Sequence, residues 1–345
     1  MRILISGHLG YIGTILAPFA RNAGYEVVGL DSDLYQGCDF QRPPEEFPTL
    51  KKDIRDVTAP DLKGFDAILH LAALSNDPLG NLNPQLTFDI NFEGSLHLAK
   101  LAREAGVKRF LFSSSCSNYG AGGEDLLDES AELHPVTPYG ESKVKVETEV
   151  SKLANDDFSP TFLRNATAYG VSPRIRFDLV LNNLVAWAVT TGKIYLKSDG
   201  SPWRPIIHIE DISRAFLAIL AAPREVVHNQ AFNIGQTNEN YRISEIASLV
   251  AEVVPGCEVT YAPDAGPDKR NYRVSCSKIQ RLVPQFVPQW TARKGAVELR
   301  DAFQKIGLTP DDFEGPRYKR ISCIQTLLNN GNLGVDLRWK MEQPV

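Results

Sequence analysis

The chain has 345 residues, of which 43% are hydrophobic and 23% are charged, a composition that is typical of a soluble globular enzyme. Its 37 basic and 42 acidic side chains give a formal net charge of -5. That charge gives no reason to expect nucleic acid or a membrane surface as a partner. The length is sufficient for two domains.

The first residues already form an apolar pattern typical of a strand, and no apolar run of about 18 residues follows. We therefore expect a cytoplasmic protein without a membrane partner. The five cysteines form no CxxC pair and are odd in number. Free thiols in a reducing compartment, and no metal site, are the expected state.

The first predicted strand, Arg2–Ser6, leads into a GxxGxxG turn and an amphipathic helix over residues 11–23. The three glycines of the turn are Gly7, Gly10 and Gly13. Glycines at such a turn let backbone N–H groups approach a pyrophosphate at the helix N-terminus. A second strand over residues 25–30 ends in Asp31, where an acid can bind the ribose hydroxyls of a dinucleotide. Because a carboxylate repels a 2′-phosphate, the sequence predicts NAD in preference to NADP.

Strands and helices continue to alternate along the first half of the chain. The predicted strands cover residues 49–53, 67–71, 107–113 and 160–164, and the predicted helices cover residues 84–106 and the stretch that carries residue 139 and ends near residue 154. This alternation predicts an α/β fold with a Rossmann-type, doubly wound parallel sheet. Residues 231–234 are expected to add a further strand to it.

The stretch between residues 113 and 143 contains the candidate catalytic residues. Tyr139 and Lys143 are four residues apart, so on a helix they share a face. An ammonium group beside a phenol favours the phenolate, which makes the tyrosine a better base. Ser115 precedes them and could hold a substrate oxygen. Such a group can take a proton from a sugar alcohol while a hydride leaves its carbon. By itself the YxxxK spacing is common in helices, and an ordinary surface pair is the alternative.

After residue 171 the regular alternation breaks. We predict a helix over residues 177–192, a strand over 194–197, a loop over 198–204 and a helix that ends near residue 222. The predicted domains are an NAD-binding domain, residues 1–170 plus about 205–236, and a smaller, mostly helical substrate-binding domain, residues 171–204 plus 237–345. The tail from residue 314 onward has no assigned role.

Together these motifs resemble the extended short-chain dehydrogenase/reductase family, in its NAD-dependent nucleotide-sugar epimerase/dehydratase branch, over residues 1–310. Asn91 and the serines at 113–115 add to the resemblance. It implies that Tyr139 is the acid/base, that Lys143 binds the nicotinamide ribose and lowers the tyrosine pKa, and that Ser115 assists at the substrate hydroxyl. The implied cofactor contacts are Gly7, Gly10, Tyr11, Ile12, Gly13, Asp31, Asp53, Ile54, Leu71, Ala72, Ala73, Ser113, Tyr139 and Lys143.

The resemblance extends to the substrate side. Residues 203–211 resemble the family's RDxxHVxD segment, and Asp268-Lys269-Arg270 resembles its GDxR segment. In relatives these arginines contact the nucleotide diphosphate, which suits the bidentate hydrogen bonds of a guanidinium. Ordinary salt bridging is the alternative. The implied substrate contacts are Ser75, Cys116, Ser117, Thr167, Asn182, Arg204 and Arg270.

The chain departs from the family pattern at two places. Sugar-nucleotide 4,6-dehydratases carry Asp-Glu where this chain has Cys116-Ser117, so that dehydration would lack its acid and base. Epimerases often carry Ala-Thr there, which is closer. We expect Cys116 to be a small thiol that lines the pocket. The asparagine that often contacts the substrate diphosphate is replaced by Thr167, with Asn165 two residues earlier.

Three functions remain open from the sequence. The favoured one is an epimerase that oxidises a nucleotide-linked sugar, most often at C4, and returns the hydride to the other face. The second is a net dehydrogenase or ketoreductase acting on a nucleotide-linked deoxysugar. The third is a catalytically silent NAD-binding regulator, which would typically lack the Tyr139 or Lys143 present here. The resemblance also implies a homodimer built from the helix over residues 84–106 and the helix carrying Tyr139.

Overall fold

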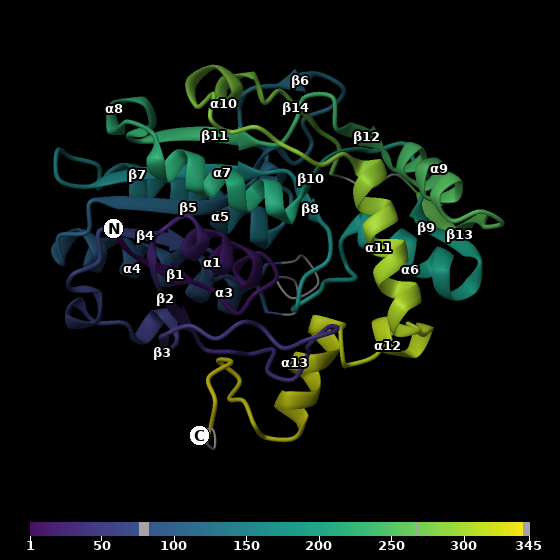
Figure 1. Cartoon of the computed structure of the whole chain (residues 1–345), viewed down its shortest axis with the longest axis horizontal. Coiled ribbons are helices and arrows are strands. Elements are labelled where there is room, and N and C mark those ends of the chain that lie inside the picture. Colours follow the sequence, from purple (N-terminus) through teal and green to yellow (C-terminus); the bar gives the residue numbers. More distant parts are fainter. Residues whose placement is uncertain (76–82, 267, 269, 341–345) are drawn as a thin grey trace.

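A seven-stranded parallel sheet forms the centre of the molecule, with strand order β11-β7-β5-β4-β1-β2-β3 (Figure 1). The computed structural model describes residues 1–75, 83–266, 268 and 270–340. The strands are β1 Arg2–Ser6, β2 Glu26–Asp31, β3 Thr49–Lys51, β4 Ala67–His70, β5 Arg109–Ser115, β7 Ser159–Asn165 and β11 Gln230–Ile234. The strand order reverses between β1 and β4, which is where such sheets bind ligands beyond the carboxyl ends of their strands.

Helices cover both faces of this sheet because successive side chains of a buried strand point to opposite sides. Ile3 and Ile5 of β1 pack with helices α1 and α7, whereas Leu4 packs with α4 and α5. The bounds of these helices are α1 Gly13–Asn22, α4 Gly94–Glu104, α5 Pro138–Ser151 and α7 Ile209–Ala221. The predicted doubly wound α/β fold is therefore confirmed, including the additional strand β11.

The long helix expected over residues 84–106 is divided into three parts. Helix α3, Pro84–Thr87, is followed by a π-helical turn, η3 Phe88–Glu93, and then by α4. Asn91 lies in this turn and holds the segment after β4: its Oδ1 accepts from the Leu74 N–H at 2.8 Å and its Nδ2 donates to the Leu74 carbonyl at 3.1 Å. The wider π-helical turn thus carries the Asn91 side chain, whose amide holds Leu74 in a wall of the cavity described below.

A second lobe contains small sheets and helices around its own buried cluster, on the right of Figure 1. Its sheets pair β12-β10-β8 and β13-β9. The elements of this half are β8 Thr167–Tyr169, α6 Val180–Thr191, β9 Lys193–Ser198, β10 Trp203–His208, β12 Asn240–Arg242, α9 Ile243–Val253, β13 Glu258–Gly266, α11 Ala292–Ile306 and α12 Pro310–Glu314. The expected loop over residues 198–204 was partly wrong, because Trp203 and Arg204 are strand residues that pair with Arg242 and Tyr241.

Shorter elements complete the described part of the chain. They are η1 Ile54–Asp56, η2 Ala59–Leu62, η4 Cys116–Tyr119, β6 Leu126–Leu127, α8 Arg224–Val227, β14 Arg273–Val274, α10 Ser277–Leu282 and α13 Arg320–Asn329. None of the described helices is long and apolar enough to cross a bilayer. The domain division stays a prediction, and residues 320–340 pack against the sheet half of the molecule rather than only against the second lobe.

Candidate active site

A cavity of about 1010 Å³ opens at the carboxyl ends of the central strands and extends to the second lobe. This volume is at the upper end of what small-molecule sites usually have. Its walls include all the residues expected to bind the cofactor, namely Gly7, Gly10, Tyr11, Ile12, Gly13, Asp31, Asp53, Ile54, Leu71, Ala72, Ala73, Ser113, Tyr139 and Lys143. The tertiary structure thus brings these separated motifs into one space.

The glycine turn fits a pyrophosphate because side chains are sterically excluded from it. Gly7 has φ +76°, and a Cβ there would lie 2.7 Å from the Ala72 nitrogen. A Cβ on Gly13 would lie 2.2 Å from the Gly7 carbonyl oxygen. The turn therefore packs tightly beside the end of β4. The N–H groups of Thr14, Ile15 and Leu16 already donate to carbonyls of the turn, so a phosphate would be bound by the N–H groups that precede them.

Asp31 ends β2 and faces the same cavity. Its carboxylate accepts from the Leu9 N–H at 3.0 Å and from the Asp33 N–H at 2.9 Å. These two bonds hold the carboxylate in place, while burial raises its pKa. A fixed acceptor at this position can bind a ribose diol, and it disfavours a 2′-phosphate.

We expect Asp31→Ala to weaken NAD binding by about 10- to 100-fold, the range that one or two hydrogen bonds to a charged acceptor supply. The preference for NAD over NADP should shrink as well. Titration of both dinucleotides by calorimetry measures both effects, and Asp301→Ala, on the exposed face of α11, is the matched control. Tighter binding of NADP than of NAD by the wild type would contradict this assignment.

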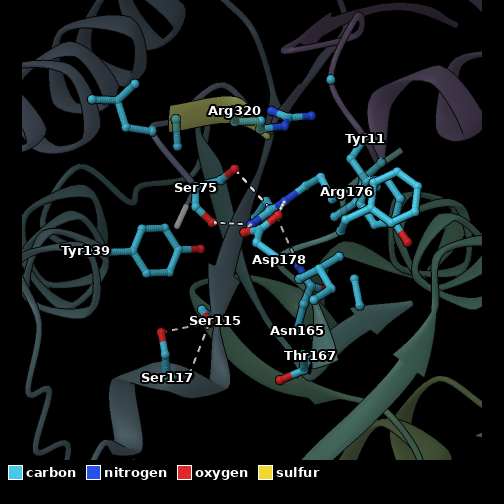
Figure 2. Close-up of a pocket in the computed structure, with 18 of the residues that line it drawn as sticks. Tyr11, Ser75, Ser115, Ser117, Tyr139, Asn165, Thr167, Arg176, Asp178 and Arg320 are labelled. Carbon is cyan, nitrogen blue, oxygen red and sulfur yellow. Dashed lines mark hydrogen bonds and ion pairs between the residues drawn. The ribbon is translucent and has the colours of Figure 1, made fainter. Parts of the chain in front are cut away.

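Helix α5 presents the tyrosine and the lysine to the cavity. Thr137 caps the helix, because its hydroxyl accepts from the Gly140 N–H at 3.2 Å, and Pro138 starts the first turn. Tyr139 therefore lies in the first turn and Lys143 one turn later, on the same face. The hydroxyl of Tyr139 points into the cavity in Figure 2.

Lys143 is buried beneath the tyrosine. Its ammonium donates to the Ser113 carbonyl at 2.8 Å and lies 4.5 Å from the centroid of the Phe112 ring and 5.6 Å from that of Tyr139. Burial lowers the pKa of Lys143 from 10.5 to about 7. An acceptor such as a ribose hydroxyl would favour its charged form, which is the form that supports a phenolate.

Two serine hydroxyls lie at the end of β5, below Tyr139 in Figure 2. The Ser117 hydroxyl donates to Ser115 Oγ at 2.8 Å, and the Ser117 N–H donates to the same oxygen at 3.1 Å. Both serines line the cavity. Ser115 is thereby oriented as a hydroxyl whose own proton can be offered to a substrate oxygen.

A buried ion pair supports this wall from behind. Glu147, on α5, accepts from Arg164 Nη2 at 2.7 Å and from Ser114 Oγ at 2.5 Å. Arg164 also donates to the Tyr119 hydroxyl at 3.0 Å. The network connects α5, β5 and β7, so it fixes the distance between the helix carrying Tyr139 and the strand carrying Ser115. Sequence reasoning did not identify it.

The two arginines expected on the substrate side share one carboxylate. Asp268 Oδ2 accepts from Arg204 Nη2 at 2.8 Å and from Arg270 Nη2 at 2.7 Å. All three side chains line the cavity, as do Ser75 and Thr167. Guanidinium groups at this end of the cavity suit an anion such as a diphosphate, because they can donate bidentate hydrogen bonds to it. Lys269 lies outside the described residues.

Two expected substrate contacts do not reach the cavity. The Cys116 thiol is fully buried, donates to the Arg164 carbonyl at 3.1 Å and packs in the core, so the expectation that it lines the pocket was wrong. Asn182 is also fully buried, and its amide bonds the Tyr11 hydroxyl and the Arg176 carbonyl. It supports the site from behind, whereas its neighbour Asn183 lines the cavity.

The structure adds charged residues that sequence reasoning missed. Arg176 donates to Ser75 Oγ at 3.1 Å and pairs with Asp178 at 2.6 Å, and both charged groups lie near Tyr139 in Figure 2. Arg320, from the C-terminal tail, lines the same space. The sequence contained one signal for the first pair, the charged residues Arg174, Arg176 and Asp178, which alternate with apolar ones at the start of a predicted helix. Nothing local pointed to Arg320.

The fold and the site define an oxidoreductase-type enzyme that binds a dinucleotide, with a tyrosine and a lysine of one helix in the same cavity. The family model described as "NAD dependent epimerase/dehydratase family" matches residues 3–235. The chain belongs to this family, and NAD is its cofactor.

Individual relatives differ in their reactions. A UDP-glucose 4-epimerase from Bacillus subtilis is 27% identical over 287 residues, 76% of this chain and 84% of that protein. UDP-glucuronic acid decarboxylase 1 from Arabidopsis thaliana is 26% identical over 328 residues, 91% of this chain and 72% of that protein. Among solved structures, an NAD-dependent NDP-hexosamine 5,6-dehydratase has a TM-score of 0.78 at 24% identity, covering 88% of this chain and 98% of that one. The comparisons support an NAD-dependent enzyme that modifies nucleotide sugars.

Proposed function

We propose that this protein is a nucleotide-sugar epimerase that works through a transient keto-sugar, with hydride transfer at C4. The observation that carries the proposal is the composition of the wall facing Tyr139. That wall presents the Ser115 and Ser117 hydroxyls, and the two positions after Ser115 hold a core thiol and a serine instead of carboxylates. An epimerase needs one acid/base and one hydride acceptor, and this wall supplies nothing for an elimination.

The residues of the chain divide the work as follows. Tyr139, as phenolate, takes the proton of a sugar hydroxyl, while Ser115 holds the same oxygen. Lys143 stabilises the phenolate and binds the cofactor. NAD, when bound, accepts the hydride from the sugar carbon and returns it. The Tyr139 phenol then gives its proton back to the oxygen of the inverted carbon, so that protons and electrons balance over the cycle.

A dehydratase would require a base, and one carboxylate in this part of the cavity is a candidate for that role. Asp178 lines the cavity, but it accepts from Arg176 at 2.6 Å and 3.0 Å. Both oxygens of this carboxylate are thus engaged by one guanidinium, which leaves the group poorly placed to accept a proton from a substrate. This pairing supports an epimerase over a 4,6-dehydratase. A net dehydrogenase or ketoreductase uses the same tyrosine and lysine and remains the second candidate.

The proposal is tested in two steps. UDP-, dTDP-, GDP- and CDP-sugars are first screened by thermal shift, since a ligand at 100 times its dissociation constant adds about 2.7 kcal/mol of stability. The best ligand is then supplied with deuterium at C4, and the product is followed by NMR and mass spectrometry. We expect an epimer of unchanged mass that keeps the deuterium at C4. Loss of water, loss of carbon dioxide or stoichiometric reduction of added NAD would each contradict an epimerase.

We also propose a homodimer formed by α5 and the helical segment α3–η3–α4. Phe88, Phe92 and Leu96 of that segment are only partly buried in the single chain, and Lys145 of α5 lies 4.7 Å from the centroid of the Phe88 ring. Half-buried aromatic side chains on the segment that packs beside α5 favour a partner surface. Light scattering at micromolar concentration should give twice the chain mass of 38.2 kDa. A monomer mass would contradict the proposal.

A further inference from the structure

The C-terminal strap, residues 320–340, returns across the molecule to the edge of the sheet where β2 and β3 end. Figure 1 shows α13 and the following tail beside the connection between these two strands. Trp339 Nε1 donates to the Ser32 carbonyl at 2.7 Å, and Arg55 Nη2 donates to the Asp336 carbonyl at 2.9 Å. Arg338 pairs with Asp56 at 2.9 Å. The strap is therefore attached directly after Asp31 and Asp53, the residues expected at the adenosine end of the cofactor.

Buried apolar side chains also attach the strap to the rest of the molecule. Ile324, Leu333 and Leu337 have exposed fractions of 0%, 1% and 4%. They belong to the same buried cluster as Ile54 and Leu74. Burial of this kind stabilises an attached segment because it removes apolar surface from water. The strap is thus an integral wall, and Leu337 lines the cavity itself.

Arg320, the first residue of the strap, brings a buried positive charge into the cavity. Its guanidinium lies 4.1 Å from the centroid of the Tyr35 ring, and its exposed fraction is 9%. Arg320 takes part in none of the ion pairs among the described residues. It has a side-chain hydrogen bond with Tyr35, and the Asp178–Arg176 pair lies close enough to interact with it electrostatically. Nearby acids of the cavity are already paired, as shown by Asp33 with Arg174, Asp53 with Arg55 and Asp178 with Arg176. A buried guanidinium without an ion pair is costly, and an anion in the cavity would offset that cost.

The position of Arg320 indicates which anion it serves. Its nearest aromatic neighbour, Tyr35, lies on the segment that follows Asp31, whereas Arg204 and Arg270 form a separate cationic pair around Asp268. Asp31 would hold the adenosine ribose. The pyrophosphate of the dinucleotide is attached to the 5′ carbon of that ribose through an oxygen atom. We propose that the C-terminal strap is part of the NAD site: Arg320 binds the cofactor's pyrophosphate, and the strap closes the cavity over the adenosine half. This inference rests on NAD as cofactor and does not depend on the choice of reaction.

A closed strap has a kinetic consequence. On this proposal, entry and release of the dinucleotide require a shift of residues 320–340, which makes release slow compared with turnover. An enzyme that returns its hydride to the same sugar benefits from such retention, because its cofactor never needs to exchange. Breaking an outer attachment of the strap should therefore speed both entry and release, whereas removing the Arg320 charge should mainly speed release.

The test compares Arg320→Met with Arg317→Met in protein freed of cofactor. Arg317 lies three residues earlier, is exposed and does not line the cavity, so its variant is the matched control. Calorimetry with ADP should show about 10- to 100-fold weaker binding for Arg320→Met only. Binding of adenosine, which has no phosphate, should be unchanged. Wild-type ADP affinity in Arg320→Met, or equal losses for ADP and adenosine, would overturn the pyrophosphate contact.

The gating half of the inference is tested by Trp339→Ala, whose side chain lies outside the cavity. Stopped-flow measurement of NAD binding and release should give both rate constants raised by at least several-fold, with little change in their ratio. This variant keeps the inference testable if Arg320→Met fails to fold, which circular dichroism would reveal. Rate constants equal to those of the wild type would show that the strap does not gate the site.

Discussion

Tyr139→Phe should lower kcat by about 10²–10⁴-fold, because a positioned proton transfer typically raises the rate by about that factor. NAD binding should stay close to that of the wild type. The variant keeps the ring that packs above Lys143 and removes only the group that carries the proton. The hydroxyl points into the cavity, where Ser115 and Ser117 also lie, so its loss leaves the cofactor walls intact. The measurement is the initial rate with the best sugar nucleotide, together with a calorimetric titration of NAD.

Cys116→Ala is the control that distinguishes loss of the proton carrier at Tyr139 from a change in a neighbouring side chain. The Cys116 thiol donates to the Arg164 carbonyl in the core, and burial raises its pKa well above the usual value. Because this thiol packs in the core and does not line the cavity, we expect the rate to change by no more than a few-fold. Wild-type turnover by Tyr139→Phe, or a loss in Cys116→Ala as large as that in Tyr139→Phe, would show that the acid/base is misassigned.

Lys143→Met should damage both NAD binding and catalysis. The ammonium is fixed by its bond to the Ser113 carbonyl and lies beneath the Tyr139 ring, where it can donate to a ribose hydroxyl and favour the phenolate. Methionine keeps the length of the side chain but neither donates nor carries charge. We expect a loss in kcat similar to that in Tyr139→Phe and, in contrast to that variant, a measurable loss in NAD affinity. Unchanged NAD affinity would remove the lysine from the cofactor site.

The same substitution should change how stability depends on pH in the protein freed of cofactor. The Lys143 pKa is about 7 in the folded chain and 10.5 in its ordinary environment. Between these values the unfolded chain binds a proton that the folded chain does not, so the free energy of unfolding contributed by Lys143 rises with pH, on the order of 1 kcal/mol per unit. Urea unfolding at pH 7 and pH 9 should show this rise in the wild type relative to Lys143→Met. Equal slopes for both proteins would contradict the buried, neutral lysine.

The parts of the site that could be predicted are those in which one residue type is required at one spacing. A tight turn between a strand and a helix requires glycine, and the steric limits at Gly7 and Gly13 show why. The tyrosine and lysine are one helical turn apart, so their common face follows from helix geometry alone. The residues on these two motifs all line the cavity.

The errors occurred where the sequence does not specify which way a side chain points. Asn182 and Asn183 are adjacent on α6, and a helix turns about 100° per residue, so only one of the two faces the cavity. Cys116 follows the end of β5 in a short 3₁₀ turn, where the alternation of the strand no longer applies and the thiol turns into the core. Neither orientation can be derived without the elements that pack on the other side.

By itself the sequence determined the class of fold, the dinucleotide turn, the acid at the end of the second strand and the common helix face of Tyr139 and Lys143. These depend on local rules of backbone geometry and on hydrophobic periodicity. Only the tertiary structure brought Arg320 to Tyr35, Trp339 to Ser32 and Arg176 to Ser75. Such contacts join segments that are far apart along the chain, and no local pattern encodes them, because they exist only once the packing of the whole chain has placed both partners.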